Sequence, residues 1–154
     1  MTPQQIREAI AASPELQAWA APNVRRDDLI AAALSVGRTR VVSRMVSARG
    51  LAEHVPGGPL AAEGILLKLE GARDAMLASQ DAGTRVMGSL LRRQLGFLAG
   101  DGLDFGSAAL RGMLDQFEAQ GVLTTAEVDG LKAIALVPDP VPVNAVSDAI
   151  NEGV

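Results

Sequence analysis

Apolar residues recur every three or four positions along most of the chain, a spacing that predicts amphipathic helices. The first helix is expected over residues 3–12. It restarts at Ser13, which can cap the next turn, with Pro14 at the first helical position. Another helix is expected within residues 25–37, with Asp27 or Asp28 in its first turn and Gly37 as its stop.

Two longer helices are expected in the middle of the chain. The helix over residues 60–77 places five apolar side chains on one face: Ile65, Leu66, Leu69, Ala72 and Met76. The helix over residues 85–100 is apolar through Val86, Leu90, Leu91 and Phe97, with Arg85, Arg92 and Arg93 on the outside. Each pattern predicts a helix with one buried face and one solvated face.

Two further helices meet in the sequence GVLTTAEVDGLKAIA, residues 121–135. The preceding helix, which carries Leu110, Met113, Leu114 and Phe117, is expected to stop at Gly121. Thr124 and Glu127 are spaced as a capping box, and Leu123 can pack against Val128 as a hydrophobic staple. This stretch therefore predicts a tight corner between two helices.

Two segments depart from the helical pattern. In residues 38–50 apolar and polar residues partly alternate, which is compatible with a short strand, an extended arm or a poor helix. The sequence VPDPVP, residues 137–142, predicts a stiff linker, followed by a short helix over residues 143–150 that Asn144 can cap.

The predicted fold is mainly α: a compact bundle of about six short helices, an extended Pro-rich C-terminal arm, and a short strand or extended segment near residues 38–47. We expect a single helical domain over residues 1–136, and a linker with a short helical arm over residues 137–154.

Composition narrows the class of protein. The chain has 154 residues, 3% aromatic residues and no cysteine, so we expect a core of small and aliphatic side chains without disulfides or thiolate metal ligands. The net charge of -4 argues weakly against bulk nucleic-acid binding. The N-terminus lacks a signal pattern, and no apolar run approaches the roughly 18 residues of a membrane helix. These features predict a soluble, unsecreted protein with no membrane contact.

The aspartates near residue 101 do not fit the pattern of a calcium-binding loop. A calcium-binding loop that starts at Asp101 has Leu103 and Phe105 at ligand positions, and Gly112 where the bidentate glutamate belongs. We therefore interpret Asp101 and Asp104 as turn and helix-start residues, and we expect no metal site.

No catalytic or cofactor-binding motif stands out either. The only histidine, His54, lies beside Glu53, and the nearby serines have no nucleophile motif around them. The glycines before Pro59 are followed by no Lys-Ser/Thr pair, so they predict a turn and not a phosphate cradle. We expect no cofactor and no enzymatic activity, and an activity centred on His54 and Glu53 is the weakest hypothesis.

Four arginines form the first candidate interface: Arg38, Arg40, Arg44 and Arg49. No acidic residue lies among them, and such a local positive charge suits phosphates or an acidic protein surface. Because no aromatic residues interleave for base stacking, we favour a protein interface over nucleic acid.

The C-terminal segment supplies the second set of candidate interface residues: Pro138, Pro140, Pro142, Val143, Val146 and Ile150. In one interpretation this segment folds back on its own domain. In the other, an extended arm docks on a neighbouring subunit, and Val143, Val146 and Ile150 form an apolar peg. The peg is too short to be a stable helix alone, so either interpretation requires a partner surface.

The order of several segments resembles a family of small proteins from the structural-gene region of tailed bacteriophages. The resemblance covers roughly residues 28–145, and its recurring pieces are GRTR (37–40), GGP (57–59), DGLDFGS (101–107) and GVLTTAE (121–127). It implies a virion component of the head–tail connector or tail region, present in several copies. It implies no catalytic residues.

The combined expectation is a non-enzymatic virion structural protein, assembled in the host cytoplasm, that binds copies of itself and other virion proteins. The alternative is a nucleic-acid-associated packaging or regulatory protein that uses the segment from Arg38 to Arg49.

Overall fold

The structure, a computed structural model, describes residues 1–152. Helices make up 66% of the chain, which confirms the mainly α class, and a few short strands accompany them. The described residues contain nine helices instead of about six. The helices at the N-terminus remain separate because Thr2 and Ser13 each cap a helix of their own with a side-chain oxygen.

The chain divides into two compact units. Unit 1 consists of residues 1–40 with the C-terminal segment from Val137, and unit 2 consists of residues 41–136. The chain passes between them in β1 (Thr39–Val41) and again in β4 (Leu136–Pro138), and these two strands pair with each other. This division differs from the expected domain over residues 1–136, because the C-terminal segment completes the fold of the N-terminal helices.

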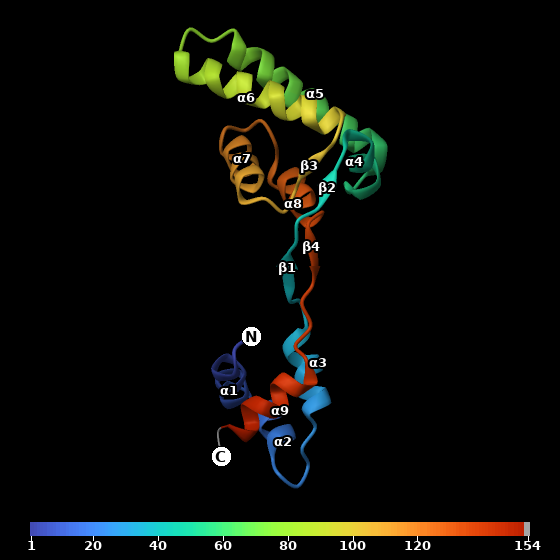
Figure 1. Ribbon diagram of the computed structural model, residues 1–154, viewed down its shortest axis with the longest axis vertical. Coiled ribbons are helices and arrows are strands. Elements are labelled where there is room, and N and C mark those ends of the chain that lie inside the picture. Colours follow the sequence, from blue (N-terminus) through green and yellow to red (C-terminus); the bar gives the residue numbers. More distant parts are fainter. Residues whose placement is uncertain (153–154) are drawn as a thin grey trace. The chain divides into compact units, whose positions relative to one another are not determined.

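The described residues of unit 1 form four helices, and the last of them packs against the first and the third (Figure 1). They are α1 (Pro3–Ala12), α2 (Pro14–Ala20), α3 (Asp27–Ser35) and α9 (Val143–Asn151). The core joins Ile6 and Ile30 to Val146 and Ala149, all of them fully buried. Residues from both ends of the chain therefore form one hydrophobic core.

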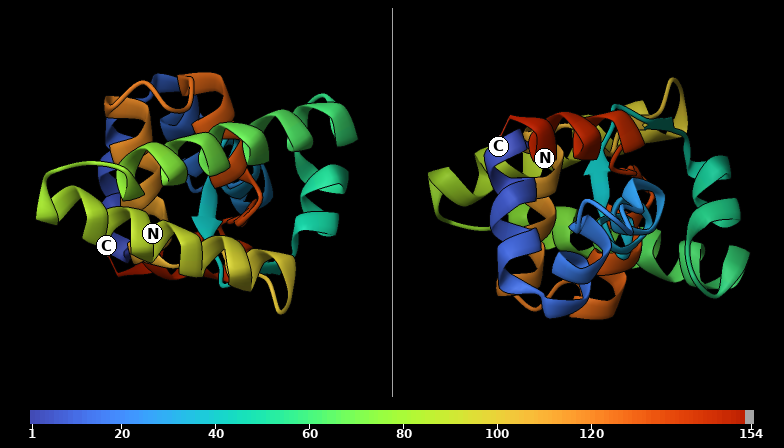
Figure 2. Two further views of the ribbon diagram at one scale, coloured as in Figure 1. Left: turned by 90° about the horizontal axis from the view of Figure 1, so that it is seen from above. Right: turned by 90° about the horizontal axis from the view of Figure 1, so that it is seen from below.

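Unit 2 contains five helices and a two-stranded antiparallel sheet. The helices are α4 (Ala48–His54), α5 (Gly58–Leu77), α6 (Ala82–Ala99), α7 (Ala108–Ala119) and α8 (Thr125–Ala133). The strands are β2 (Met45–Val46) and β3 (Leu103–Asp104), with Met45 opposite Asp104 and Val46 opposite Leu103. The helices α5 and α6 form a hairpin and lie side by side (Figures 1 and 2).

The segment over residues 38–50 combines strand and helix. Its strands β1 and β2 agree with the short strand expected near residues 38–47. Helix α4 was not predicted, because it is only seven residues long and contains Gly50. Its start is nevertheless encoded locally, since the Ser47 hydroxyl accepts a hydrogen bond from the Gly50 amide.

The corner at residues 121–128 is confirmed. Gly121 has a φ of 72°, which suits a helix stop, and Thr124 and Glu127 form the reciprocal capping box. Leu123 and Val128 are both buried in the core of unit 2. At α9, by contrast, the helix begins at Val143 after Pro142, so Asn144 lies inside the first turn and is not the cap.

The buried face of α5 is as expected, with Ile65 and Leu69 in the core of unit 2. The predicted face of α6 is wrong at three of its four positions. Val86, Leu90 and Phe97 are 67%, 38% and 47% exposed, and only Leu91 of the predicted set is buried.

Helix α6 turns another face to the core, formed by Gly88, Leu91, Leu95 and Leu98. Gly88 allows the close contact with α5, since a Cβ there would lie 2.9 Å from the backbone nitrogen of Leu77. The sequence of α6 contains two apolar faces, and packing within the chain covers one of them.

Candidate protein interaction surfaces

The four predicted interface arginines are divided between the units. Arg38 and Arg40 belong to unit 1, whereas Arg44 and Arg49 belong to unit 2. Neither unit therefore contains the whole predicted arginine cluster, and each arginine has its own surroundings.

Arg38 is held by the C-terminal segment. Its Nη2 lies 2.5 Å from Oδ2 of Asp139, and its Nε donates to the Asp139 carbonyl oxygen at 3.3 Å. The Asp139 amide in turn donates to the carbonyl of Arg38 at 3.1 Å. Arg38 thus has a structural role: it ties the start of the Pro-rich segment to the end of the N-terminal segment.

Arg44 is likewise engaged within unit 2. Its Nη1 donates to the carbonyl of Ile134 at 3.0 Å, and its Nη2 lies 3.3 Å from Nε2 of His54. The only histidine in the sequence therefore has a structural neighbour in Arg44. Arg40 and Arg49 are exposed, and within residues 1–152 their side chains make no hydrogen bond or ion pair, so these two arginines of the set remain open to a partner.

Asp104 has the turn-forming role that the sequence predicted. Its carboxylate accepts hydrogen bonds from the amides of Arg44 and Gly106, at 2.8 and 2.9 Å, and from the Ser43 hydroxyl at 2.9 Å. These donors, the Arg44 amide first, lower the pKa of the Asp104 carboxyl. The aspartate holds the loop before β2 against β3.

The C-terminal segment folds back on its own unit. Val146 is fully buried, Ile150 packs partly buried against the same core, and Val141 is buried with its amide bonded to the Ser35 hydroxyl at 2.8 Å. Two of the three predicted peg residues are therefore occupied within the chain. Val143 remains 48% exposed, and the prolines Pro138, Pro140 and Pro142 are also exposed.

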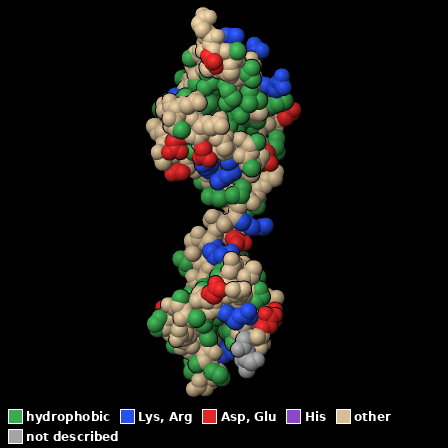
Figure 3. Space-filling view, turned by 90° about the vertical axis from the view of Figure 1, so that its left-hand side faces the viewer, with side chains coloured by type: hydrophobic (Ala, Val, Ile, Leu, Met, Phe, Trp, Pro, Cys, Tyr) green, Lys and Arg blue, Asp and Glu red, His purple; other side chains and the backbone are tan. Residues whose placement is uncertain are grey.

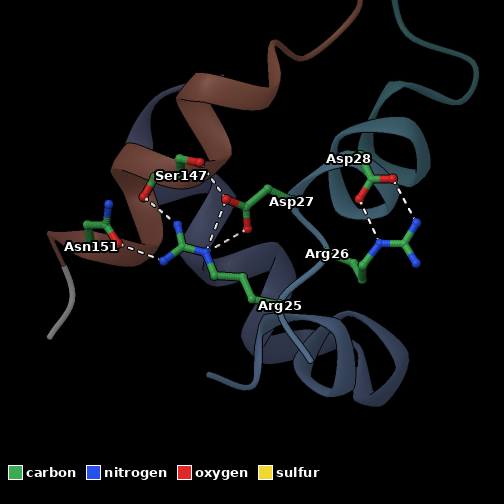
Figure 4. A network of polar contacts seen from close by, with 6 residues as sticks. All are labelled: Arg25, Arg26, Asp27, Asp28, Ser147 and Asn151. Atoms are coloured by element: carbon green, nitrogen blue, oxygen red, sulfur yellow. Dashed lines mark hydrogen bonds and ion pairs between the residues drawn. The ribbon is translucent and has the colours of Figure 1, made fainter. Parts of the chain in front are cut away.

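A polar network fastens α9 to the start of α3 (Figure 4). The Nε of Arg25 donates to both carboxylate oxygens of Asp27, at 2.9 and 3.1 Å, and its Nη2 donates to the Ser147 carbonyl at 3.2 Å. The Ser147 hydroxyl also donates to Asp27. The hydrogen bond from Arg25 is the chief reason why the pKa of Asp27 is lowered.

Figure 4 also shows a second pair, Arg26 with Asp28, which is bidentate but reaches no other residue of the network. Both side chains are more than half exposed. The inner pair thus anchors α9, while the outer pair lies at the surface of α3.

An exposed apolar surface that the sequence analysis did not predict lies on α5 and α6. Leu60 and Leu67 of α5 are 85% and 59% exposed, and Val86, Leu90 and Phe97 of α6 are exposed as well. On the side of unit 2 drawn in Figure 3, hydrophobic side chains gather near the centre, and several Lys or Arg side chains lie along the upper right edge. The signal was present in the sequence as a second apolar stripe on each helix, opposite the buried one.

Two classes of site find no support in the part of the chain that the structure describes. Residues 1–152 contain no group of three or more His, Cys, Asp or Glu side chains that could hold a metal ion. No helix in this range is long and apolar enough to cross a membrane.

The exposed apolar side chains of α5 and α6 are therefore the main candidate for a protein interaction surface. Comparison with known proteins adds no relative: no family model, no curated protein and no solved structure matches this chain.

Proposed function

We propose that this chain is a non-enzymatic structural protein of a bacteriophage virion. It acts by protein–protein assembly in several copies, in the head–tail connector or tail region. The proposal combines the resemblance of residues 28–145 to structural-region phage proteins with the surface of unit 2.

One observation carries the assembly role. Helix α6 buries one apolar face in unit 2 and leaves a second apolar face, with Val86, Leu90 and Phe97, uncovered by the chain. Exposed large apolar side chains that recur along one helix face are typical of surfaces that another protein covers. Helix α5 adds Leu60 and Leu67 to the uncovered apolar surface of the same hairpin.

The proposal is tested on purified phage particles whose genome encodes this chain. Mass spectrometry of particles separated from host lysate should detect the protein at several copies per particle. A soluble host protein, measured in the same fractions, serves as the control for contamination. If the chain is absent from particles while other minor virion proteins are detected, the virion role is wrong.

The alternative role in nucleic-acid binding rests on Arg40 and Arg49, which are exposed. Arg38 and Arg44 are engaged by Asp139 and Ile134, so the segment offers phosphates fewer cations than the sequence indicated. A DNA mobility shift at physiological salt, with a steep salt dependence that Arg40→Glu and Arg49→Glu abolish, would favour this alternative.

A further inference from the structure

Helix α6 carries an exposed row of four side chains, here named the α6 stripe: Val86, Leu90, Arg93 and Phe97. Successive members are separated by four, three and four residues, the spacing of side chains that face one neighbouring helix. The buried residues Leu91 and Leu98 lie on the other side of α6. The α6 stripe therefore lies on a face of the helix that the rest of the described chain leaves exposed.

Helix α5 carries a second row with the same spacing, here named the α5 stripe: Leu60, Gly64, Leu67 and Gly71. Its two leucines are among the most exposed large apolar side chains of the protein. Its glycines alternate with them, which leaves gaps beside the leucines into which side chains of another helix fit.

Packing within the chain gives no reason for the glycines of the α5 stripe. A Cβ at Gly64 or Gly71 would meet nothing within 4 Å, whereas a Cβ at Gly88 would collide with α5. Glycine inside a helix is less favourable than alanine, so both positions need another explanation. Close approach of another helix from outside the chain would account for both positions.

The charges beside the two stripes are opposite. Helix α6 contains Arg85, Arg92 and Arg93 and no acidic residue, whereas Glu63 and Glu70 line one side of the α5 stripe. Lys68, on the other side of the α5 stripe, is already paired with Glu127 of the same chain. Among residues 1–152, no ion pair joins an acidic side chain of α5 to an arginine of α6. The two surfaces are thus complementary to each other and are not neutralised within one copy.

The spacing of these charges fits one arrangement of two helices. Glu63 and Glu70 are seven residues apart and follow one side of the α5 stripe, and Arg85 and Arg92 are also seven apart and follow the corresponding side of the α6 stripe. In an antiparallel pair, corresponding sides meet. Glu63 then lies near Arg92 and Glu70 near Arg85, with Leu67 facing Leu90.

We propose that the α5 stripe of one copy binds the α6 stripe of a second copy of this chain as an antiparallel helix pair. The two stripes are different surfaces, so every copy offers both halves of the contact, and such a contact can repeat into a ring or a chain of subunits. This inference rests on the proposed function and deepens it, because it identifies the neighbour in the multi-copy assembly as the protein itself.

The decisive experiment uses two full-length variants, Leu67→Glu in the α5 stripe and Leu90→Glu in the α6 stripe. The wild-type protein should form oligomers in native mass spectrometry and analytical ultracentrifugation at about 100 μM, a concentration high enough to populate micromolar contacts. Each variant alone should be monomeric, with an unchanged far-ultraviolet circular dichroism spectrum. An equimolar mixture should contain a complex with one copy of each, because each variant retains the half that the other has lost.

Charge reversal provides the second test and does not depend on the apolar variants. Glu63→Arg or Arg92→Glu alone should weaken association about tenfold, and the double variant should restore most of it. Glu8→Arg on α1 makes the same charge change on an exposed site of unit 1 and should leave association unchanged.

Three results would overturn the inference: a wild-type protein that stays monomeric, a Leu90→Glu variant that assembles like wild type, or an equimolar mixture without a complex. These results are independent of the virion assay. A protein that self-associates through the stripes but is absent from particles would refute the proposed function and leave the contact intact.

Discussion

Arg25 and Asn151, 126 residues apart in the chain, are joined by a hydrogen bond of 2.7 Å between Nη1 and Oδ1. The same guanidinium binds Asp27, whose carboxylate also accepts the hydroxyl of Ser147 on α9. The final helix is therefore fixed to the start of α3 by polar contacts as well as by its apolar face.

Replacing Asp27 should weaken unit 1 more than replacing its exposed neighbour. Asp27→Ala removes one of the acceptors of Arg25 and the acceptor of the Ser147 hydroxyl, and it should cost about 2 kcal/mol of unfolding free energy. The single tryptophan, Trp19, packs against the core of unit 1, so its fluorescence in urea denaturation reports this unit. Asp28→Ala, at the exposed pair with Arg26, should change the urea midpoint little.

The stability of unit 1 should also fall in acid. Because the pKa of Asp27 is lowered in the folded protein, the unfolded chain binds the proton first as the pH decreases. The stabilisation is fully present above the ordinary aspartate pKa of about 3.9 and is lost as the pH falls through the folded value. The tryptophan-detected urea midpoint should therefore be steady from about pH 7 to 5 and decline below about pH 4.

Of the other carboxyl groups with lowered pKa values, only Asp28 belongs to unit 1 and contributes to the same decline. The others belong to unit 2 and do not change the tryptophan signal of unit 1: Asp74, Asp81, Asp104 and Glu127. The Asp27→Asn variant isolates the contribution of the Asp27 carboxyl. It should lose less stability in acid than the wild type does. An identical pH profile for the variant and the wild type would contradict the role of the network.

The C-terminal helix should behave as part of the core of unit 1. Val146→Ala removes two methyl groups from a fully buried site and should lower the unfolding free energy by about 2 kcal/mol. Val143→Ala, on the same helix but half exposed, should change it by no more than about 0.5 kcal/mol. Equal effects of the two substitutions would show that α9 does not dock as described.

The Thr124 cap of α8 should make a measurable contribution to the unfolding free energy. Thr124→Ala removes the acceptor for the Glu127 amide and should cost about 1 kcal/mol, whereas Thr124→Ser keeps it and should cost less. Thermal unfolding, monitored by circular dichroism, compares the two variants with the wild type. Addition of calcium should leave the melting temperature of all three proteins unchanged, and a calcium-dependent rise would reopen the metal-site hypothesis for residues 101–112.

Two glycines of the helical hairpin should respond to alanine in opposite ways. Gly88→Ala places a Cβ 2.9 Å from the Leu77 nitrogen and the Met76 Cβ and should destabilise unit 2 by about 2 kcal/mol. Gly71→Ala meets no atom within 4 Å and should stabilise an isolated copy by up to about 1 kcal/mol. Denaturation at a protein concentration low enough to keep the chain monomeric measures both effects.

The features that could be predicted from the sequence are local. The caps at Ser13 and Thr124 were found because their hydrogen bonds span three residues, and the mainly α class followed from the spacing of apolar residues. The buried face of α6 was assigned wrongly because two apolar faces compete, and only the packing of Gly88 against α5 decides between them. The position of the C-terminal helix depends on residues such as Asp27, more than a hundred positions away, whose pairing no local pattern encodes.

The division of the chain also sets an order for its folding during synthesis. Unit 2 interrupts unit 1, so α1, α2 and α3 leave the ribosome about a hundred residues before the helix that completes their core. Domains fold as units once their residues are available, and the interrupting unit is complete first. Until Val146 and Ala149 emerge, the apolar faces of Ile6 and Ile30 stay open to water or to other chains, so the newly made protein is most prone to aggregate through its N-terminal helices.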